Sequence, residues 1–483
     1  MNRQMIKYLV GRLLFFNGLF LLLPLGVSFY YREDLRYILS YLSVSLFSLL
    51  LGYLMSHNTP KQFNIYAKEG FIIVSLTWLL MSLMGSLPFI LSGDFSSVFD
   101  AIFESTSGFT TTGMTILNDV EILSRSNHFW RAFTQFLGGM GILVFALAIL
   151  PSTDSEYMNV LKAEVTGPRY GKVMPRITES TRYLFFIYIS LAILVALALV
   201  FFGMKPFDAI IHTFGVAATG GFSMYNSNVS FYNSIAIESV LAVGMLLFGI
   251  NFNLFFLAIS GHIKKAFQYD ELKWYLGIIG LAVLLVSVNI YFVYQSFPEA
   301  FHQAGFTVVS MITSTGIELS PVGEWPIFSK FILLLLMIIG GMAGSTSGGF
   351  KVSRVLVLVK TMFAEVKQNA YPNRVVTIHF EDEPLDERVI QSTSRYLIVY
   401  ISTFILLLLF MTLEFSSLSA AFSIVTATLN NTGVTLGTLG EVESLAAVSP
   451  LSKLVLSFAM IAGRLEIYPL LIFLTPSTWR HHI

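Results

Sequence analysis

The chain has 483 residues, of which 55% are hydrophobic and only 12% are charged, and its formal net charge at pH 7 is zero. Soluble domains carry about 25% charged residues, so the composition excludes an ordinary soluble domain and indicates an integral membrane protein. The absence of cysteine excludes disulfides, thiol chemistry and cysteine-based metal sites. No basic cluster or RNA-binding motif occurs, so nucleic acid is not expected as a partner.

A membrane-spanning helix needs about 20 mostly apolar residues, and ten segments of the chain reach this length. The first follows a short basic start, as a signal peptide would, but it is too long and lacks an Ala-x-Ala-like cleavage site, so we expect it to remain a helix. The predicted spans are 7–30, 37–56, 71–92, 129–150, 184–204, 235–258, 274–297, 328–359, 396–415 and 451–475.

The orientation follows from the Lys and Arg residues, which concentrate in cytoplasmic loops. With the N-terminus inside, the inside segments hold 21 of the 29 basic residues and the outside segments hold six. Arg131 and Arg464 remain, and both fall inside predicted spans. Ten spans return the chain to the side on which it began, so we expect both termini in the cytoplasm.

Four stretches between spans are too short to cross a membrane and turn polar at a glycine. They lie roughly at 93–128, 205–234, 298–327 and 416–450. An alanine precedes the glycine by twelve residues each time, which indicates a fourfold repeat of span, re-entrant segment and span. Aligned on that glycine, they read FDAIFESTSGFTTTG (Phe99–Gly113), FDAIIHTFGVAATGG (Phe207–Gly221), HQAGFTVVSMITSTG (His302–Gly316) and SAAFSIVTATLNNTG (Ser419–Gly433).

Non-helical backbone at membrane depth persists only where it is buried in protein or lines a watery cavity. We expect a half-helix over Phe99–Ser107 and its counterparts, whose C-terminal carbonyls would favour a cation. Four glycine turns around an axis would then present rings of carbonyl oxygens that replace a cation's hydration shell. The alternative is close helix packing through small residues, which four matching repeats disfavour. The predicted selectivity filter comprises Thr110, Thr111, Thr112, Gly113, Ala218, Thr219, Gly220, Gly221, Thr313, Ser314, Thr315, Gly316, Asn430, Asn431, Thr432 and Gly433.

These four motifs resemble those of the TrkH/KtrB/HKT superfamily of potassium transporters, and the resemblance covers nearly the whole chain. Two extra N-terminal spans make the chain more similar to the TrkH branch than to the shorter KtrB branch. The resemblance implies K⁺ uptake across the cytoplasmic (inner) membrane by a homodimer, with K⁺ bound at the filter residues. It also implies a cytosolic nucleotide-binding regulatory subunit (TrkA-like). One departure is Gly220, where the other three loops carry Thr112, Thr315 and Thr432.

A second polar interruption, GGMAGSTSGGF at Gly340–Phe350, falls inside the eighth predicted span. Its glycines are spaced by four, as in a close helix–helix contact, but two Gly-Gly pairs and a Ser-Thr-Ser run are poor helix formers. We favour a broken helix whose loop lies in the pore, and the resemblance implies a gating loop there. The predicted gate residues are Gly340, Gly341, Gly344, Ser345, Thr346, Ser347, Gly348, Gly349 and Arg464.

Arg464 lies near the middle of the last predicted span, where a charge faces a cavity or a partner. A local pair with Glu466 is disfavoured because residues two apart do not share a helix face. We expect Arg464 to point beneath the filter and to donate to carbonyls or hydroxyls of the 340–350 loop. Glu104 and His212, in the re-entrant segments, are expected to be buried and hydrogen-bonded, and a proton relay is the alternative.

The longest cytosolic loops are 151–183 and 360–394. No glycine-rich nucleotide motif occurs in this chain, so no cofactor is expected in it, and ATP or NAD would act only through a partner docking on these loops. Plain solvated linkers are the alternative for both.

The sequence therefore predicts an all-α membrane protein, surrounded by lipid, with four span–pore-loop–span units around one central pore. The expected parts are residues 1–60 (two N-terminal helices) and repeats at 61–150, 151–260, 261–360 and 361–483. One alternative is a proton- or sodium-coupled potassium symporter, which would carry acidic residues inside its spans. An enzyme is not expected, because no paired carboxylate, His-Glu or His-x-x-x-His constellation is present.

Overall fold

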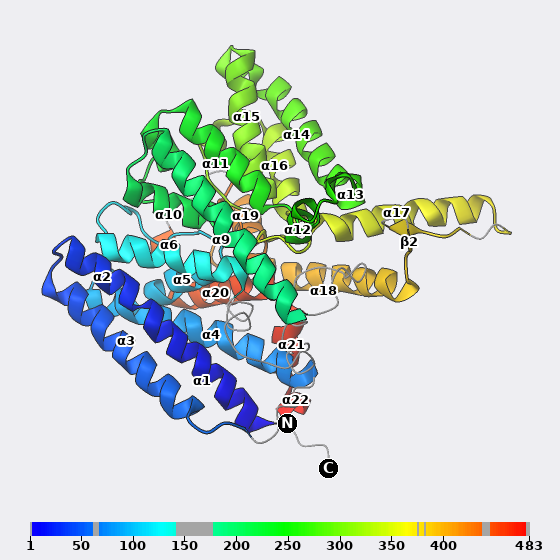
Figure 1. Ribbon diagram of the computed structural model, residues 1–483. Helices are drawn as coiled ribbons and strands as arrows, with labels where there is room; N and C mark the ends of the chain where they lie inside the picture. The colour runs from blue at the N-terminus through cyan, green and yellow to red at the C-terminus, as the bar shows by residue number, and fades with distance from the viewer. Residues whose placement is uncertain are drawn as a thin grey trace.

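The computed structural model describes residues 2–60, 67–141, 177–373, 376–380, 383–436 and 445–479. The regular elements of these residues are helices, apart from one small antiparallel hairpin in which β1 (His379–Phe380) pairs with β2 (Glu383–Pro384). The predicted all-α architecture is confirmed (Figure 1).

The N-terminal part is a helical hairpin at one side of the molecule (Figure 1). It comprises α1 (Arg3–Phe20), α2 (Leu22–Tyr30) and α3 (Leu35–Ser56). The helices α1 and α3 pack closely, and the Ser45 hydroxyl donates to the Gly18 carbonyl at 2.7 Å. This contact satisfies a buried hydroxyl inside an apolar interface.

The remaining chain runs four times through the same order of elements: a long helix, a short helix, a loop and a second short helix. The long helices are α4 (Ala67–Ser92), α9 (Ile177–Phe201), α14 (Asp270–Tyr294) and α18 (Glu387–Met411). The first short helices are α5 (Val98–Phe109), α10 (Pro206–Ala217), α15 (Phe297–Ile312) and α19 (Leu418–Leu429), and the second are α6 (Arg125–Met140), α11 (Ile235–Phe248), α16 (Ile327–Ile339) and α20 (Pro450–Arg464).

Six helical segments of the described chain are long and apolar enough to cross a membrane, which indicates a multi-pass membrane protein. They agree with six predicted spans, and they are Arg3–Tyr30, Leu35–Ser56, Lys68–Ser92, Arg182–Phe201, Asp270–Tyr294 and Glu387–Met411.

The sequence wrongly predicts two continuous spans. The span predicted at 235–258 is broken, because α11 and α12 (Phe252–Ile259) meet at an angle of 92°. The span predicted at 451–475 is interrupted after Arg464, where Glu466 and Ile467 have positive φ before α21 (Tyr468–Leu474). Hydropathy does not detect such breaks, since an apolar stretch remains apolar whether or not its helix bends.

The break expected inside 328–359 is present: α16 ends at Ile339 and α17 (Val352–Ala370) begins after a non-helical loop. In the first repeat, α6 ends at Met140, and Gly141 has a φ of 82°. The rest of that predicted span, 142–150, and most of the predicted docking loop 151–183 lie outside the described residues.

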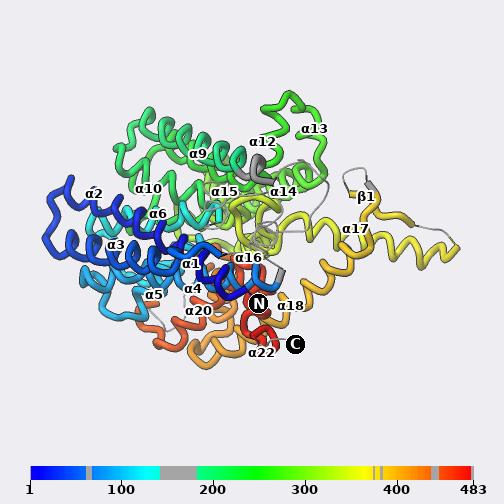
Figure 2. Tube along the Cα trace, turned by 60° about the horizontal axis from the view of Figure 1, so that its bottom comes forward, coloured from blue at the N-terminus to red at the C-terminus, as the bar shows by residue number. Residues whose placement is uncertain are grey.

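The helix α17 extends away from the body of the molecule, with the hairpin beside it (Figure 1). The other short elements are α13 (Ile263–Gln268), α22 (Pro476–Trp479) and the 3-10 helices η1 (Asn228–Tyr232), η2 (Val322–Glu324) and η3 (Leu445–Ala447). In both views α22 lies near the start of α1 (Figures 1 and 2).

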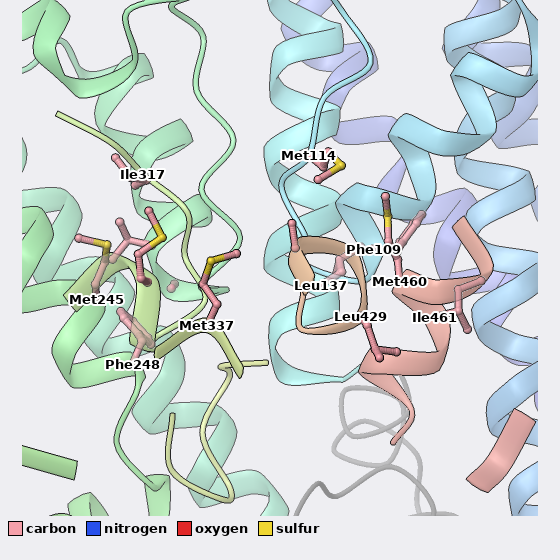
Figure 3. Close-up of a cluster of buried hydrophobic side chains, with 14 of the residues drawn as sticks. Phe109, Met114, Leu137, Met245, Phe248, Ile317, Met337, Leu429, Met460 and Ile461 are labelled. Carbon is pink, nitrogen blue, oxygen red and sulfur yellow. The ribbon is translucent and has the colours of Figure 1, made fainter. Parts of the chain in front are cut away.

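Buried apolar side chains from all four repeats form one core around the loops that follow the first short helices (Figure 3). Protein interiors are closely packed and leave few voids, so these side chains fix the loops between the helices. The labelled members are Phe109, Met114, Leu137, Met245, Phe248, Ile317, Met337, Leu429, Met460 and Ile461.

Candidate functional site

The four predicted filter segments, residues 110–113, 218–221, 313–316 and 430–433, adopt the same backbone conformation; we call them the glycine loops. Each follows the C-terminus of a first short helix. Two residues before the final glycine, φ is positive although the residue is not glycine: Thr111 (55°), Thr219 (53°), Ser314 (56°) and Asn431 (53°). The final glycines also have positive φ, namely Gly113 (77°), Gly221 (70°), Gly316 (72°) and Gly433 (73°).

Each glycine loop is fastened to its own short helix by the same pair of hydrogen bonds. In the first loop the main-chain N–H groups of Thr112 and Gly113 both donate to the Ser107 carbonyl, at 2.9 and 3.4 Å. The equivalent acceptors are the carbonyls of Gly215, Ser310 and Ala427. Because the N–H groups are used in this way, the loop carbonyls remain available to face other partners.

The four loops meet in a closed ring. A Cβ built on Gly113 would lie 1.6 Å from the Gly220 carbonyl oxygen, and one built on Gly221 would lie 2.0 Å from the Thr315 oxygen. A Cβ on Gly316 would lie 1.9 Å from the Thr432 oxygen, and one on Gly433 would lie 2.1 Å from the Thr112 oxygen. Each loop therefore touches the next, the fourth touches the first, and every final position admits only glycine.

Side chains behind the ring hold the loops in place. The hydroxyls of Thr110 and Thr112 lie 2.8 Å apart, as do those of Thr313 and Thr315. In the fourth loop the Asn431 amide donates to the Thr112 hydroxyl at 3.0 Å, which links the last loop to the first. The Tyr400 hydroxyl donates to the Asn430 side-chain oxygen at 2.9 Å.

The second loop differs, and Gln135 of α6 explains the difference. A Cβ on Gly220 would lie 2.6 Å from the Gln135 side-chain nitrogen, so a threonine does not fit there. The Gln135 side-chain oxygen accepts from the Phe222 N–H at 3.2 Å. The sequence does not identify Gln135, because its partner lies 87 positions further along the chain.

Beside the first loop, Glu104 and Arg131 form a buried ion pair with an N–O distance of 2.7 Å. Glu104 also accepts from the Thr115 hydroxyl and from the Ile116 N–H at 2.9 Å, so the prediction that Glu104 is hydrogen-bonded is confirmed. The same prediction for His212 is wrong, since neither of its ring nitrogens has a hydrogen-bond partner among the described residues. Its ring instead lies edge-on to Tyr232, with centroids 5.5 Å apart.

The loop between α16 and α17, residues 340–351, lies directly against the ring; we call it the interhelix loop. Its backbone is not helical, with positive φ at Gly340, Gly344, Gly349 and Lys351. The Gly348 N–H donates to the Ser314 hydroxyl, so the interhelix loop contacts the third glycine loop. The predicted gate residues Gly340–Gly349 are therefore together and next to the predicted filter.

Arg464 reaches the interhelix loop, as expected. It donates to the Thr346 carbonyl at 2.8 Å and to the Thr111 hydroxyl at 3.3 Å. Its other nitrogen donates to the carbonyls of Gly138 and Gly139, at 2.6 and 2.8 Å. One side chain from the last repeat thus joins the first repeat to the third.

A further basic side chain, Lys351, lies near Arg464 in the same region. Lys351 is buried and its ammonium donates to the Ser347 carbonyl. Glu466, near Arg464 in the sequence, pairs with Arg354 at the start of α17. The sequence alone does not identify Lys351, which is simply a basic residue after the glycine-rich stretch.

Comparison with known proteins gives consistent matches over the full length. The family model for TrkH, described as a cation transport protein, matches residues 40–481. The Trk system potassium uptake protein TrkH of Salmonella typhimurium is 36% identical over 486 residues, covering 99% of this chain and 100% of that protein. TrkG of Escherichia coli, also a Trk system potassium uptake protein, is 30% identical and covers 99% of each chain.

The fold has a solved counterpart as well. The crystal structure of the potassium transporter TrkH from Vibrio parahaemolyticus matches with a TM-score of 0.89 and 35% sequence identity. It covers 99% of this chain and 100% of that one.

Proposed function

The chain belongs to the TrkH family of cation transport proteins, and from this premise we propose that it takes up K⁺ through a channel-like pore whose selectivity filter is the ring of glycine loops. The observation that carries the proposal is the closed cycle of contacts, in which each final glycine meets a carbonyl oxygen of the next loop. Four neighbouring carbonyls offer the oxygen ligands that a potassium ion needs when it leaves water.

The electrostatics of the ring favour a cation. All four first short helices, α5, α10, α15 and α19, end where a glycine loop begins. The C-terminus of a helix carries about half an elementary negative charge. Four such termini directed at one ring lower the free energy of a partly dehydrated cation and raise that of an anion.

The interhelix loop, Arg464 and Lys351 form the gate in this proposal. The partly buried Arg464, the buried Lys351 and a non-helical segment lie next to the glycine loops. A K⁺ ion leaving the filter would meet the positive charge of Arg464. Conduction then requires the interhelix loop and the Arg464 side chain to move aside.

We favour channel-like flux over coupled symport because the two carboxylates of α5 are both engaged in ion pairs. Glu104 pairs with Arg131, and Asp100 pairs with Lys453 at 2.6 Å. Both carboxylates therefore hold α5 against α6 and α20, and neither is an unpaired acid.

We place the protein in the cytoplasmic (inner) membrane with both termini inside, as a homodimer. A cytosolic nucleotide-binding regulatory subunit (TrkA-like) would dock on the loops 151–183 and 360–394. The names of the matched Trk system proteins support the idea of such a multi-subunit assembly. Because α17 extends away from the body of the molecule, the loop 360–394 has an accessible surface (Figure 1).

The purified chain in liposomes tests the function. We expect uptake of K⁺ and its analogue Rb⁺ down their gradient, weak uptake of Na⁺, and no dependence on a pH gradient. Flux that requires a proton or sodium gradient would instead establish the symporter. Absence of any cation flux, with and without added cytosolic partner, would contradict the proposal.

A further inference from the structure

One buried carboxylate joins the interhelix loop to the start of α17. Glu271, in the first turn of α14, accepts from the Ala343 N–H at 2.7 Å and from the Ser353 N–H at 3.1 Å, both at the same oxygen. Ala343 lies within the loop, and Ser353 lies in the first turn of α17. Glu271 is 1% exposed, so water does not compete for these bonds.

The break between α11 and α12 holds the opposite side of the same loop. The Met342 N–H donates to the Gly249 carbonyl, and the Phe252 N–H donates to the Gly344 carbonyl, both at 3.1 Å. The 92° bend frees these main-chain groups from the helix and turns them toward the loop. Hydrogen bonds therefore attach the interhelix loop to the bend between α11 and α12 and, through Glu271, to α14.

The residue next to Glu271 connects this attachment to the surface. Asp270 pairs with Lys360 of α17 at 2.8 Å. Lys360 also donates to the His379 carbonyl in β1 at 2.9 Å. Ser353 and Lys360 are seven residues apart, about two helical turns, so they share the face of α17 that lies along the start of α14.

We propose that Glu271 is a positioning residue that holds the interhelix loop closed, and that the Asp270–Lys360 pair couples it to the exposed part of α17 and the hairpin. The inference rests on the proposed gating role of that loop. A shift of α17 along α14 moves Ser353 away from Glu271, and the same shift is opposed by the ion pair two turns further along. A cytosolic partner that moves α17 or the hairpin therefore acts on the loop without touching it.

The direct test removes the acceptor. In liposomes without a partner, Glu271→Ala is expected to raise Rb⁺ leak about tenfold or more, because two buried N–H donors lose a charged acceptor. Glu271→Gln keeps an oxygen at the same place and is expected to leak much less. Glu365→Ala, an exposed acid on α17, is the matched control and should leave the leak unchanged.

A second variant leaves Glu271 intact. Ser353→Pro removes the N–H that donates to Glu271, together with the serine hydroxyl, in the first helical turn, where proline is tolerated. It should raise the leak in the same direction. Asp270→Asn is expected to give a small leak by itself and to weaken the response to the cytosolic partner. If Glu271→Ala does not fold, Ser353→Pro decides the matter.

A readout independent of flux uses the absence of native cysteine. Ser345→Cys places the only thiol of the chain in the interhelix loop. Its modification by a water-soluble thiol reagent should be slow in the otherwise native chain and faster with Glu271→Ala. If neither leak nor thiol modification changes while Arg464→Ala does raise the leak, the role of Glu271 is overturned but the proposed function stands. If no variant carries any flux, the proposed function fails, and the thiol modification rate still reports on Glu271.

Discussion

The Arg464 guanidinium donates to the Thr346 carbonyl at 2.8 Å, although the two residues are 118 positions apart in the sequence. This bond joins the last repeat to the interhelix loop. The same side chain reaches the carbonyls of Gly138 and Gly139 at the end of α6. A single side chain of the last repeat therefore links the first and third repeats, next to the glycine loops.

Replacing this cation tests the gate. Arg464→Ala removes four hydrogen bonds and one positive charge, so we expect Rb⁺ leak in liposomes to rise. Arg464→Lys keeps the charge and should leak less. Unchanged or reduced flux in Arg464→Ala, with the thermal stability of the protein preserved, would contradict a gating role.

The glycines of the ring are expected to be intolerant of any side chain. Gly316→Ala would place a Cβ 1.9 Å from the Thr432 oxygen and should abolish selective K⁺ uptake. Gly305→Ala is the matched control within the same short helix, because a Cβ there meets nothing within 4 Å. Equal loss of uptake in both variants would show that the ring geometry is not what matters.

Gly220 and Gln135 are expected to be coupled. Gly220→Thr restores the residue type of the other loops but brings it against the Gln135 side chain, so K⁺ uptake should fall. Adding Gln135→Ala should recover part of the loss. Additive effects of the two changes, measured as uptake rates in a double-mutant cycle, would contradict this explanation.

The buried ion pair of Glu104 and Arg131 is expected to contribute to the stability of the fold. Glu104→Ala leaves a buried guanidinium without its carboxylate, which costs about 3–5 kcal/mol, and the unfolding temperature in detergent should drop. The double variant Glu104→Ala with Arg131→Leu removes both charges and should be more stable than the single one. A single variant as stable as the native chain would show that the pair contributes little.

Glu318, two residues after the final glycine of the third loop, gives a pH prediction. Burial raises the pKa of its carboxyl to about 7. The group is therefore mostly protonated at pH 6 and ionised at pH 8, and an ionised carboxylate beside the loop attracts K⁺. Uptake should rise over this range, and Glu318→Gln should flatten the pH profile. A profile that Glu318→Gln does not alter would remove Glu318 from the explanation.

The parts of the site that the sequence predicts are those encoded locally. The final glycine of each glycine loop follows a fully buried alanine at the same spacing, and these alanines are Ala101, Ala209, Ala304 and Ala421. Their half-helices and the break before Lys351 follow from short apolar runs and glycine pairs. Each of these signals lies within about twenty residues of the feature that it predicts.

The parts that the sequence does not predict depend on partners far along the chain. Glu271 looks like an ordinary acid in the first turn of a helix, but its two donors are 72 and 82 residues away. The bend at Gly249–Asn251 lies in a mostly apolar run that Asn251 and Asn253 interrupt only briefly. The main-chain groups that the bend frees are satisfied by the interhelix loop. Neither propensity nor hydropathy contains information about such pairs.

The central claim is tested most directly by locating a heavy analogue of K⁺ in crystals of the protein grown with Rb⁺ or Tl⁺. Anomalous scattering should show the ion inside the ring, between the carbonyl oxygens of Thr112, Gly220, Thr315 and Thr432. Crystals that diffract well, come from protein active in uptake, and show ions elsewhere but none within the ring would contradict the account.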